Sequence, residues 1–246
     1  MKKLFVLLLA TLIVFSAGMA ATRASVGSKN FTEEYILSSM ISQLLEKEDY
    51  NVSEDFGMSS FAVRTALTTG QVDMYPEYTG TAWTSYLKQE TVVRDPVELY
   101  EKVKALDKQE NNIVWLDRID FNNTYALAVT QKFANKYGLR TIEDLANLVN
   151  KDEEKLIMGI DFEFYDRPDG FFAMSEEYGM KVDKKDVKTM EIGMTYEAIN
   201  RGNIQVAMVF ATDGKLNKFN LVVLEDNKHF FPVYNPDNSG KGILFN

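Results

Sequence analysis

Short apolar strands alternate with amphipathic helices along this chain of 246 residues. A strand expected at 24–27 is followed by a helix whose apolar positions keep helical spacing, and then by a second strand at 51–53. A helix that ends near Gly70 leads to a third strand at 72–74. Strand, helix and strand in succession predict an α/β fold built on a parallel sheet.

The same alternation continues through the rest of the chain. Further strands are expected at 113–116, 124–129, 156–160, 205–210 and 221–224, with helices between most of them. No internal repeat and no low-complexity linker interrupts the pattern. Two lobes, if the chain forms them, are therefore joined by strands rather than by a flexible tether.

Polar residues mark the expected helix starts. Asn30 followed by Glu33 resembles a capping box, in which both side chains satisfy backbone N–H groups at the beginning of a helix. Three later helices are expected to begin at polar caps, namely Ser59 or Ser60, Asp95 and Thr141.

The first 21 residues have the composition of a secretory signal peptide. Two lysines precede an apolar stretch from Leu4 to Phe15, and small residues follow. This stretch is too short for a transmembrane anchor to be the better interpretation. We therefore expect residues 1–21 to be a signal peptide, with cleavage after Ala20 or Ala24 left open. The mature protein is then expected to be soluble and periplasmic, or otherwise extracytoplasmic.

Composition narrows the classes of partner and of chemistry. The net charge of −9 argues against nucleic acid or an anionic membrane as the main partner. The chain contains no cysteine, which excludes disulfides, thiol nucleophiles, thiolate metal sites and a lipid-carrying cysteine. A freely diffusing periplasmic protein is the expectation, and secretion stays open.

The sequence offers little for catalysis. His229 is its only histidine, and it has no nucleophile elbow, no H-E-x-x-H zinc motif and no glycine-rich phosphate loop. Asp73 and Glu77 could in principle act as paired carboxylates. We expect a protein that is not an enzyme and that needs no cofactor or metal. An exported hydrolase that uses Asp73, Glu77 or His229 is the weaker alternative.

The segment from Met74 to Trp83 is the most informative for function. It holds three aromatic rings, one carboxylate and two threonines around Pro76 and Gly80. Pro76 is incompatible with a central strand or a helix interior, so we expect a loop that leaves the strand at 72–74. Loops at strand ends are where open α/β sheets bind ligands.

Several other aromatic residues lie near predicted strand ends or turns. Four of them stand beside polar neighbours where the chain changes direction: Tyr78, Tyr125, Phe210 and Tyr234. Rings that converge from separate segments can form a box around a quaternary ammonium ion, with each cation–π contact worth roughly 0.5–2 kcal/mol. Three others are expected to pack in the core instead, namely Tyr75, Tyr165 and Tyr196.

Two cations complement this box. Lys29 precedes the first mature helix, where free N–H groups and the helix dipole favour an anion. Arg167 lies in a rigid loop at 164–170, from which its guanidinium group could pair with a carboxylate. A ligand with an ammonium group at one end and a carboxylate at the other would use both the box and the cations.

These segments resemble the osmoprotectant-binding proteins of ABC transporters, the glycine betaine/choline/carnitine type. The matching segments span nearly the whole mature chain, at 27–33, 75–81, 122–127, 167–170, 212–214 and 221–234. The resemblance implies a two-lobed, type II periplasmic-binding-protein fold with a hinge of two crossing strands. The hinge strands are expected near 122–127 and 206–211, and the ligand is expected in the cleft between the lobes.

The resemblance also implies roles for individual residues and shows three departures from the family pattern. The cage residues correspond to Tyr78, Tyr125, Phe210 and Tyr234, and the carboxylate partners to Lys29, Thr81 and Arg167. Phe210 stands where the family commonly has tyrosine. Asn123 stands where aspartate is often found, which removes a negative charge near the ammonium group. The C-terminal helical segment that normally completes the first lobe is missing, so a shortened lobe is expected.

Residues 22–124 and 211–246 are therefore expected to form the first lobe, and residues 125–210 the second. The expected function is capture of a quaternary ammonium osmoprotectant for delivery to an ABC permease, by a monomer that binds no nucleic acid. Lys29 and Arg167 favour a zwitterion such as glycine betaine over choline. A binding protein for another amine or amino acid that feeds a sensor stays open as an alternative.

Overall fold

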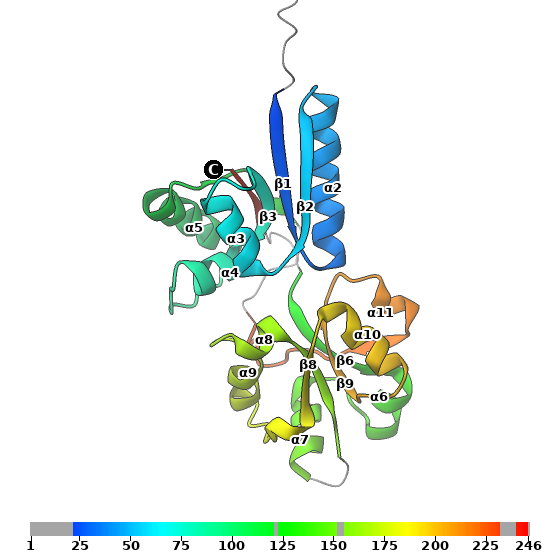
Figure 1. Cartoon of the computed structure of the whole chain (residues 1–246). Coiled ribbons are helices and arrows are strands. Elements are labelled where there is room, and N and C mark those ends of the chain that lie inside the picture. The colour runs from blue at the N-terminus through cyan, green and yellow to red at the C-terminus, as the bar shows by residue number, and fades with distance from the viewer. Residues whose placement is uncertain (1–21, 121–122, 152–154, 232–239, 246) are drawn as a thin grey trace, which may run out of the picture.

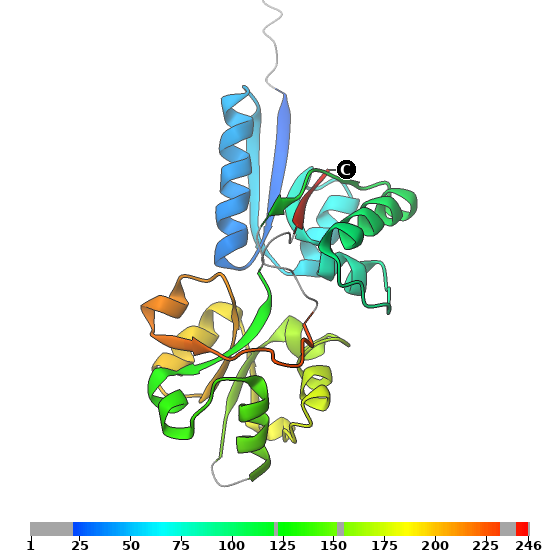
Figure 2. The same ribbon diagram turned by 180° about the vertical axis from the view of Figure 1, so that it is seen from behind.

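Two lobes, each with its own mixed sheet, lie one above the other (Figures 1 and 2). The structure is a computed structural model that describes residues 22–120, 123–151, 155–231 and 240–245. The expected signal peptide and Tyr234 lie outside these residues. Within the described ranges, no helix is both long enough and apolar enough to cross a membrane.

The first lobe is built on a sheet of order β2-β1-β3-β11-β4, in which β5 also pairs with β11. Its strands are β1 (Arg23–Lys29), β2 (Asn51–Met58), β3 (Met74–Tyr78), β4 (Val114–Trp115), β5 (Ile119–Asp120) and β11 (Gly240–Phe245). β1 runs parallel to β2 and β3, whereas β11 is antiparallel to β3, β4 and β5. β11, the strand nearest the C-terminus, thus lies in the same sheet as β1.

The second lobe is built on a sheet of order β10-β6-β9-β7-β8. Its strands are β6 (Tyr125–Thr130), β7 (Met158–Asp161), β8 (Val187–Met190), β9 (Val206–Phe210) and β10 (Leu221–Val223). β7 is parallel to β8 and β9, and β6 is antiparallel to β9 and β10. Both sheets therefore share one layout: three parallel strands, then an antiparallel strand that the chain brings across from the other lobe.

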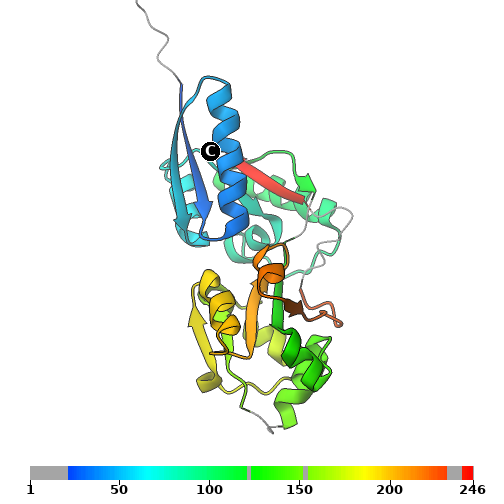
Figure 3. The ribbon, with the colours of Figure 1, turned by 90° about the vertical axis from the view of Figure 1, so that its right-hand side faces the viewer.

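Helices cover both sheets. The first lobe carries α2 (Thr32–Lys47), α3 (Ser60–Thr68), α4 (Thr79–Thr81), the π-helical turn η1 (Ala82–Tyr86) and α5 (Pro96–Asn111). The second carries α6 (Gln131–Tyr137), α7 (Ile142–Lys151), α8 (Phe162–Asp166), α9 (Phe171–Glu177), the 3₁₀ turn η2 (Lys184–Asp186), α10 (Ile192–Asn200) and α11 (Lys215–Lys218). Figure 3 shows α2 beside β1 and β2, with its N-terminal end at the junction of the lobes.

Each lobe has its own hydrophobic core. Tyr75 is fully buried in the first lobe and Tyr196 in the second, as predicted. Tyr165 packs against the core of the second lobe, which also agrees with the prediction. These three rings stabilise the lobes and are not part of the aromatic set that was expected to bind a ligand.

The lobe boundary predicted at residue 211 does not match the structure. β10 pairs with β6 in the second sheet, and Leu224 and Phe231 lie in the core of the second lobe. The second crossing between lobes therefore falls after residue 231 instead of near 206–211. The shared sheet layout explains the difference. In each lobe the chain forms one further strand, β4 in the first and β10 in the second, that lies next to the antiparallel strand of the sheet. The chain leaves the lobe only after this strand.

Pro76 lies inside β3, where the sequence predicted a loop. β3 pairs with β1 only at Met74, and β11 runs along its other side with Ile243 opposite Pro76. Among the described residues, β3 has no strand partner on its β1 side beyond Met74, so Pro76, which lacks an N–H group, removes no hydrogen bond to β1. The rest of the segment leaves the sheet as α4 and η1.

Helix starts agree with the sequence except at α2. Side-chain caps form as predicted at Ser59, Asp95 and Thr141. The capping box predicted at Asn30 and Glu33 is wrong, because Phe31 occupies the cap position of α2 and makes no side-chain cap hydrogen bond. Asn30 and Glu33 hydrogen-bond to distant parts of the fold instead.

Candidate functional site

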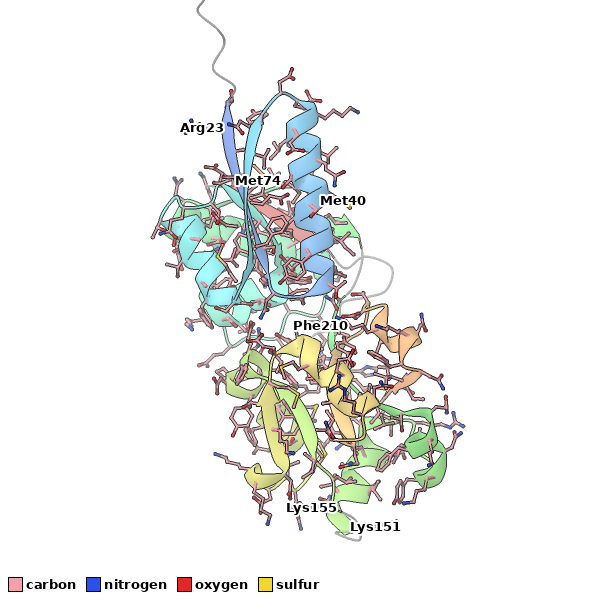
Figure 4. The ribbon with its side chains drawn as sticks, turned by 45° about the vertical axis from the view of Figure 1, so that its right-hand side comes forward. Arg23, Met40, Met74, Lys151, Lys155 and Phe210 are labelled. Atoms are coloured by element: carbon pink, nitrogen blue, oxygen red, sulfur yellow. The ribbon has the colours of Figure 1, made fainter. Side chains whose placement is uncertain are left out.

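A pocket lies between the lobes, where strand ends from both sheets meet. Its lining comes from the segments after β1 and β3 in the first lobe, and from the start of β6 and the ends of β7 and β9 in the second. The lining residues are Lys29, Asn30, Phe31, Ser60, Tyr78, Thr81, Asn123, Tyr125, Asp161, Glu163, Ile192 and Phe210. Figure 4 shows Phe210 at the junction of the lobes. Pockets between lobes and at strand ends are common sites for small molecules.

Four aromatic rings meet in this pocket, and we call Phe31, Tyr78, Tyr125 and Phe210 the aromatic cluster. The ring centroids of Phe31 and Phe210 are 4.5 Å apart, those of Tyr125 and Phe210 5.5 Å, and those of Phe31 and Tyr78 5.8 Å. Three of the four predicted cage residues are therefore brought together. Phe31 was not predicted, although an aromatic residue at the cap position of a helix is unusual enough to have been a signal.

Lys29 lies in the pocket wall, buried and already paired. Its Nζ atom forms an ion pair with Glu77 and lies 4.8 Å from the centroid of the Tyr78 ring. Glu77 also accepts hydrogen bonds from the hydroxyl groups of Tyr75 at 2.7 Å and Tyr86 at 3.0 Å. This network fixes the lysine beside the aromatic cluster.

A second carboxylate lies behind Lys29. Glu34 is fully buried, and its Oε2 atom accepts a hydrogen bond of 3.3 Å from the backbone N–H of Lys29. Burial raises the pKa of Glu34 from 4.5 to about 8, against the attraction of Lys29 and with a further increase from the charge of Glu77. Glu34 is therefore protonated near neutral pH, which leaves one carboxylate, Glu77, to balance Lys29.

Arg167 lies behind Tyr125 and is not among the residues that line the pocket. Its guanidinium carbon is 5.7 Å from the centroid of the Tyr125 ring. Its Nε and Nη2 atoms donate to Asp169 at 2.8 and 2.7 Å, and Nη2 also donates to Thr84 at 2.9 Å. Burial would raise the pKa of Asp169, but the hydrogen bond and charge of Arg167 outweigh it and lower that pKa.

Thr81 and Asn123 are both buried in the pocket wall, where the resemblance places them. The Nδ2 atom of Asn123 donates to Glu33 at 3.1 Å and lies 3.4 Å from the Tyr78 hydroxyl. Its Oδ1 atom is buried without a hydrogen-bond partner among the described residues. An unsatisfied buried oxygen that faces a pocket is available to a ligand.

Two further carboxylates, Asp161 and Glu163, line the pocket and were not predicted. Burial raises the pKa of Asp161 to about 6, and the charge of Glu163 adds to the rise, against hydrogen bonds from two backbone N–H groups. The sequence signal was present, because Asp161 directly follows the apolar strand expected at 156–160. These acidic groups make the second-lobe side of the pocket suitable for a cation.

The residues of the hydrolase alternative do not form one site. Asp73 accepts hydrogen bonds from Ser25, and Glu77 is held by Lys29 and two tyrosines. His229 does not line the pocket. Among the described residues, no group of three histidine or acidic side chains is placed to hold a metal ion.

Comparison with known proteins places the chain among transport proteins. Residues 23–238 match the family described as the substrate-binding domain of ABC-type glycine betaine transport systems. A glycine-betaine-binding protein of Pseudomonas aeruginosa is 37% identical over 228 residues, which cover 90% of this chain and 73% of that protein. A Helicobacter pylori protein named ergothioneine transport permease/ergothioneine binding protein is 33% identical over 211 residues, or 85% of this chain and 36% of that protein.

Solved structures agree with these sequence matches. The crystal structure of a glycine betaine/carnitine/choline ABC transporter protein superimposes with a TM-score of 0.66 and 31% sequence identity. The superposition covers 90% of this chain and 79% of the other. The two-lobed fold expected from the sequence is therefore confirmed.

The raised pKa of Glu34 generates a prediction for stability against pH. Between about pH 4.5 and pH 8 the folded protein retains a proton that the unfolded chain releases, so the free energy of unfolding falls as the pH rises through this window. Glu34→Gln cannot ionise and should remove this loss, so that its stability relative to wild type increases from about pH 5 to about pH 8. Urea unfolding at several pH values measures the difference. Glu46→Gln, exposed on the same helix, is the control, and parallel pH profiles for Glu34→Gln and wild type would contradict the prediction.

Proposed function

Because this chain belongs to the family of substrate-binding domains of ABC-type glycine betaine transport systems, we propose that its inter-lobe pocket binds glycine betaine. The protein is a substrate-binding protein of the glycine betaine, carnitine and choline class of ABC transport, in which the captured solute is delivered to a membrane permease. We further propose that it does so outside the cytoplasm, as a monomer. The Pseudomonas aeruginosa relative, by its name, binds glycine betaine.

The observation that carries this proposal is the aromatic cluster. Its rings come from the segment after β1, the end of β3, the start of β6 and the end of β9, and neighbouring centroids are 4.5 to 5.8 Å apart. A trimethylammonium group cannot donate a conventional hydrogen bond, and it is attracted to the electron-rich faces of aromatic rings. Such a group would rest against the ring faces that border the pocket, entering when the lobes open and being enclosed when they close.

The carboxylate of glycine betaine would bind on the Lys29 side of the pocket. Lys29 presents a buried ammonium group there, and the Thr81 hydroxyl lies in the same wall. Lys29 is paired with Glu77, so the ligand would share this cation instead of finding it vacant. Arg167 would act through Tyr125 and Asp169, which it contacts, rather than by touching the ligand.

Choline is a second candidate, and a specific observation favours it. Asp161 and Glu163 line the pocket, with Glu163 3.5 Å from Arg167, whereas its lining cation, Lys29, is already paired with Glu77. A cation with no carboxylate of its own would gain from these acidic groups and would not compete for Lys29. Another amine or amino acid, passed to a sensor, is the further alternative, and ligand-dependent transport by the cognate permease separates it from the proposal.

Removal of one cluster ring should weaken binding without unfolding the protein. We expect Tyr125→Ala to raise the Kd for glycine betaine about 5- to 30-fold, as the loss of 1–2 kcal/mol implies, while Tyr125→Phe keeps most of the affinity. Isothermal titration calorimetry measures both. Tyr137→Ala, on α6 away from the pocket, is the matched control. An unchanged Kd in Tyr125→Ala would show that the ligand does not touch this ring.

The role of Lys29 separates the two candidate ligands. Because removal of one partner alone leaves a buried charge, Lys29→Gln is combined with Glu77→Gln. We expect this pair of changes to weaken glycine betaine about tenfold or more and choline by less than about threefold, measured by calorimetry. Lys102→Gln with Glu98→Gln removes an exposed ion pair far from the pocket and is the control. An equal loss for both ligands would contradict the proposed carboxylate site, and tighter binding of choline by wild type would favour the second candidate.

A further inference from the structure

Asn30 to Glu33, which end the loop before α2 and begin its first turn, contact the second lobe at several points. The Nδ2 atom of Asn30 donates to Glu191 at 2.6 Å, and the ring of Phe31 lies against Phe210. The next two residues contact the turn after β9, through hydrogen bonds from Thr32 to Asp213 at 3.4 Å and from Thr212 to Glu33 at 2.7 Å. A segment that the sequence marks as a helix cap therefore serves as a contact surface.

Glu33 occupies the centre of these contacts. Its Oε1 atom accepts hydrogen bonds from the Tyr78 hydroxyl at 2.6 Å and from the Asn123 amide at 3.1 Å. Its Oε2 atom accepts from the Thr212 hydroxyl. One carboxylate thus joins a ring of the aromatic cluster, the segment that crosses between the lobes, and the second lobe.

The geometry at Glu33 explains why these bonds are strong. Hydrogen bonds to an ionised carboxylate are about twice as strong as those between neutral groups. Glu33 is also in the first turn of α2, where the helix dipole stabilises a negative charge. α2 itself begins without a side-chain cap.

We propose that Glu33 is a positioning residue that couples ligand binding to closure of the lobes. It orients the Tyr78 ring in the pocket and, through Thr212, holds the second lobe against the first. A ligand that rests on Tyr78 therefore stabilises the same arrangement that Glu33 and Thr212 close. This inference rests on the proposed function, because it takes the aromatic cluster as the ligand site.

Thr212→Val tests the proposal most cleanly, because it removes the hydrogen bond from the second lobe to Glu33 and leaves Glu33 bound to Tyr78 and Asn123. Thr212 is exposed and does not line the pocket, so the variant should fold. We expect it to weaken glycine betaine and choline alike, by about three- to tenfold, because the closed form becomes a smaller fraction of the protein. We also expect a larger radius of gyration for the ligand-free variant by small-angle X-ray scattering.

Three further variants complete the experiment on the full mature chain. Thr212→Ser keeps the hydroxyl and should bind and scatter like wild type, whereas Glu33→Ala should show a greater loss than Thr212→Val. Thr189→Val, at an exposed position of β8 in the same lobe, is the matched control. Wild-type affinity and wild-type radius in Thr212→Val would overturn the proposal, and they would do so even if Glu33→Ala failed to fold.

Failure of this inference can be distinguished from failure of the proposed function. If wild type binds neither solute in calorimetry, the proposed function is contradicted, and the scattering comparison still decides whether Glu33 and Thr212 close the lobes because it needs no ligand. If wild type binds and Thr212→Val closes and binds equally well, the proposed function stands and the coupling through Glu33 is wrong.

Discussion

The pairing of Tyr125 with Phe210 is the interaction on which the binding site depends. Tyr125 is the first residue of β6 and stands opposite Phe210, the last residue of β9, in an antiparallel register. This register places both rings on one face of the second sheet, at the strand ends that meet the first lobe. A shift of one residue would send the two rings to opposite faces. Because β6 is also the strand that follows the first crossing between the lobes, Tyr125 belongs to both the hinge and the aromatic cluster.

Charge balance determines what the pocket can accept. Lys29 forms an ion pair with Glu77, and Arg167 forms one with Asp169. Both cations near the pocket are therefore already paired with a carboxylate before a ligand binds. Protonation of Glu34 near neutral pH prevents a second negative charge from competing for Lys29. The selectivity between a zwitterion and a simple cation therefore depends on small differences in shared interactions and not on one unpaired charge. We therefore expect glycine betaine, which carries a carboxylate, and choline, which does not, to bind with similar affinities.

The sequence predicted the elements and the aromatic residues better than it predicted their partners. Most strands, most caps and the residues Tyr78, Tyr125 and Phe210 follow from local patterns and from the family resemblance, whereas β5, β8 and β11 were not predicted. The position of β10 could not be predicted in this way, because which sheet a strand joins depends on the topology of the whole lobe. The pattern of Asn30 and Glu33 is equally compatible with a capping box and with contacts to the second lobe. Only the approach of Thr212 and Glu191, more than 150 residues away, decides between them.

The central claim is that the pocket binds a quaternary ammonium group by its charge against aromatic faces. Calorimetric comparison of glycine betaine with 3,3-dimethylbutanoate tests this most directly, because the second compound replaces the nitrogen by carbon and keeps the shape and the carboxylate. We expect wild type to bind glycine betaine at least about tenfold more tightly, since the cation–π contribution is lost in the carbon analogue. Equal affinities would contradict this expectation and would mean that the aromatic cluster recognises shape and apolar surface alone.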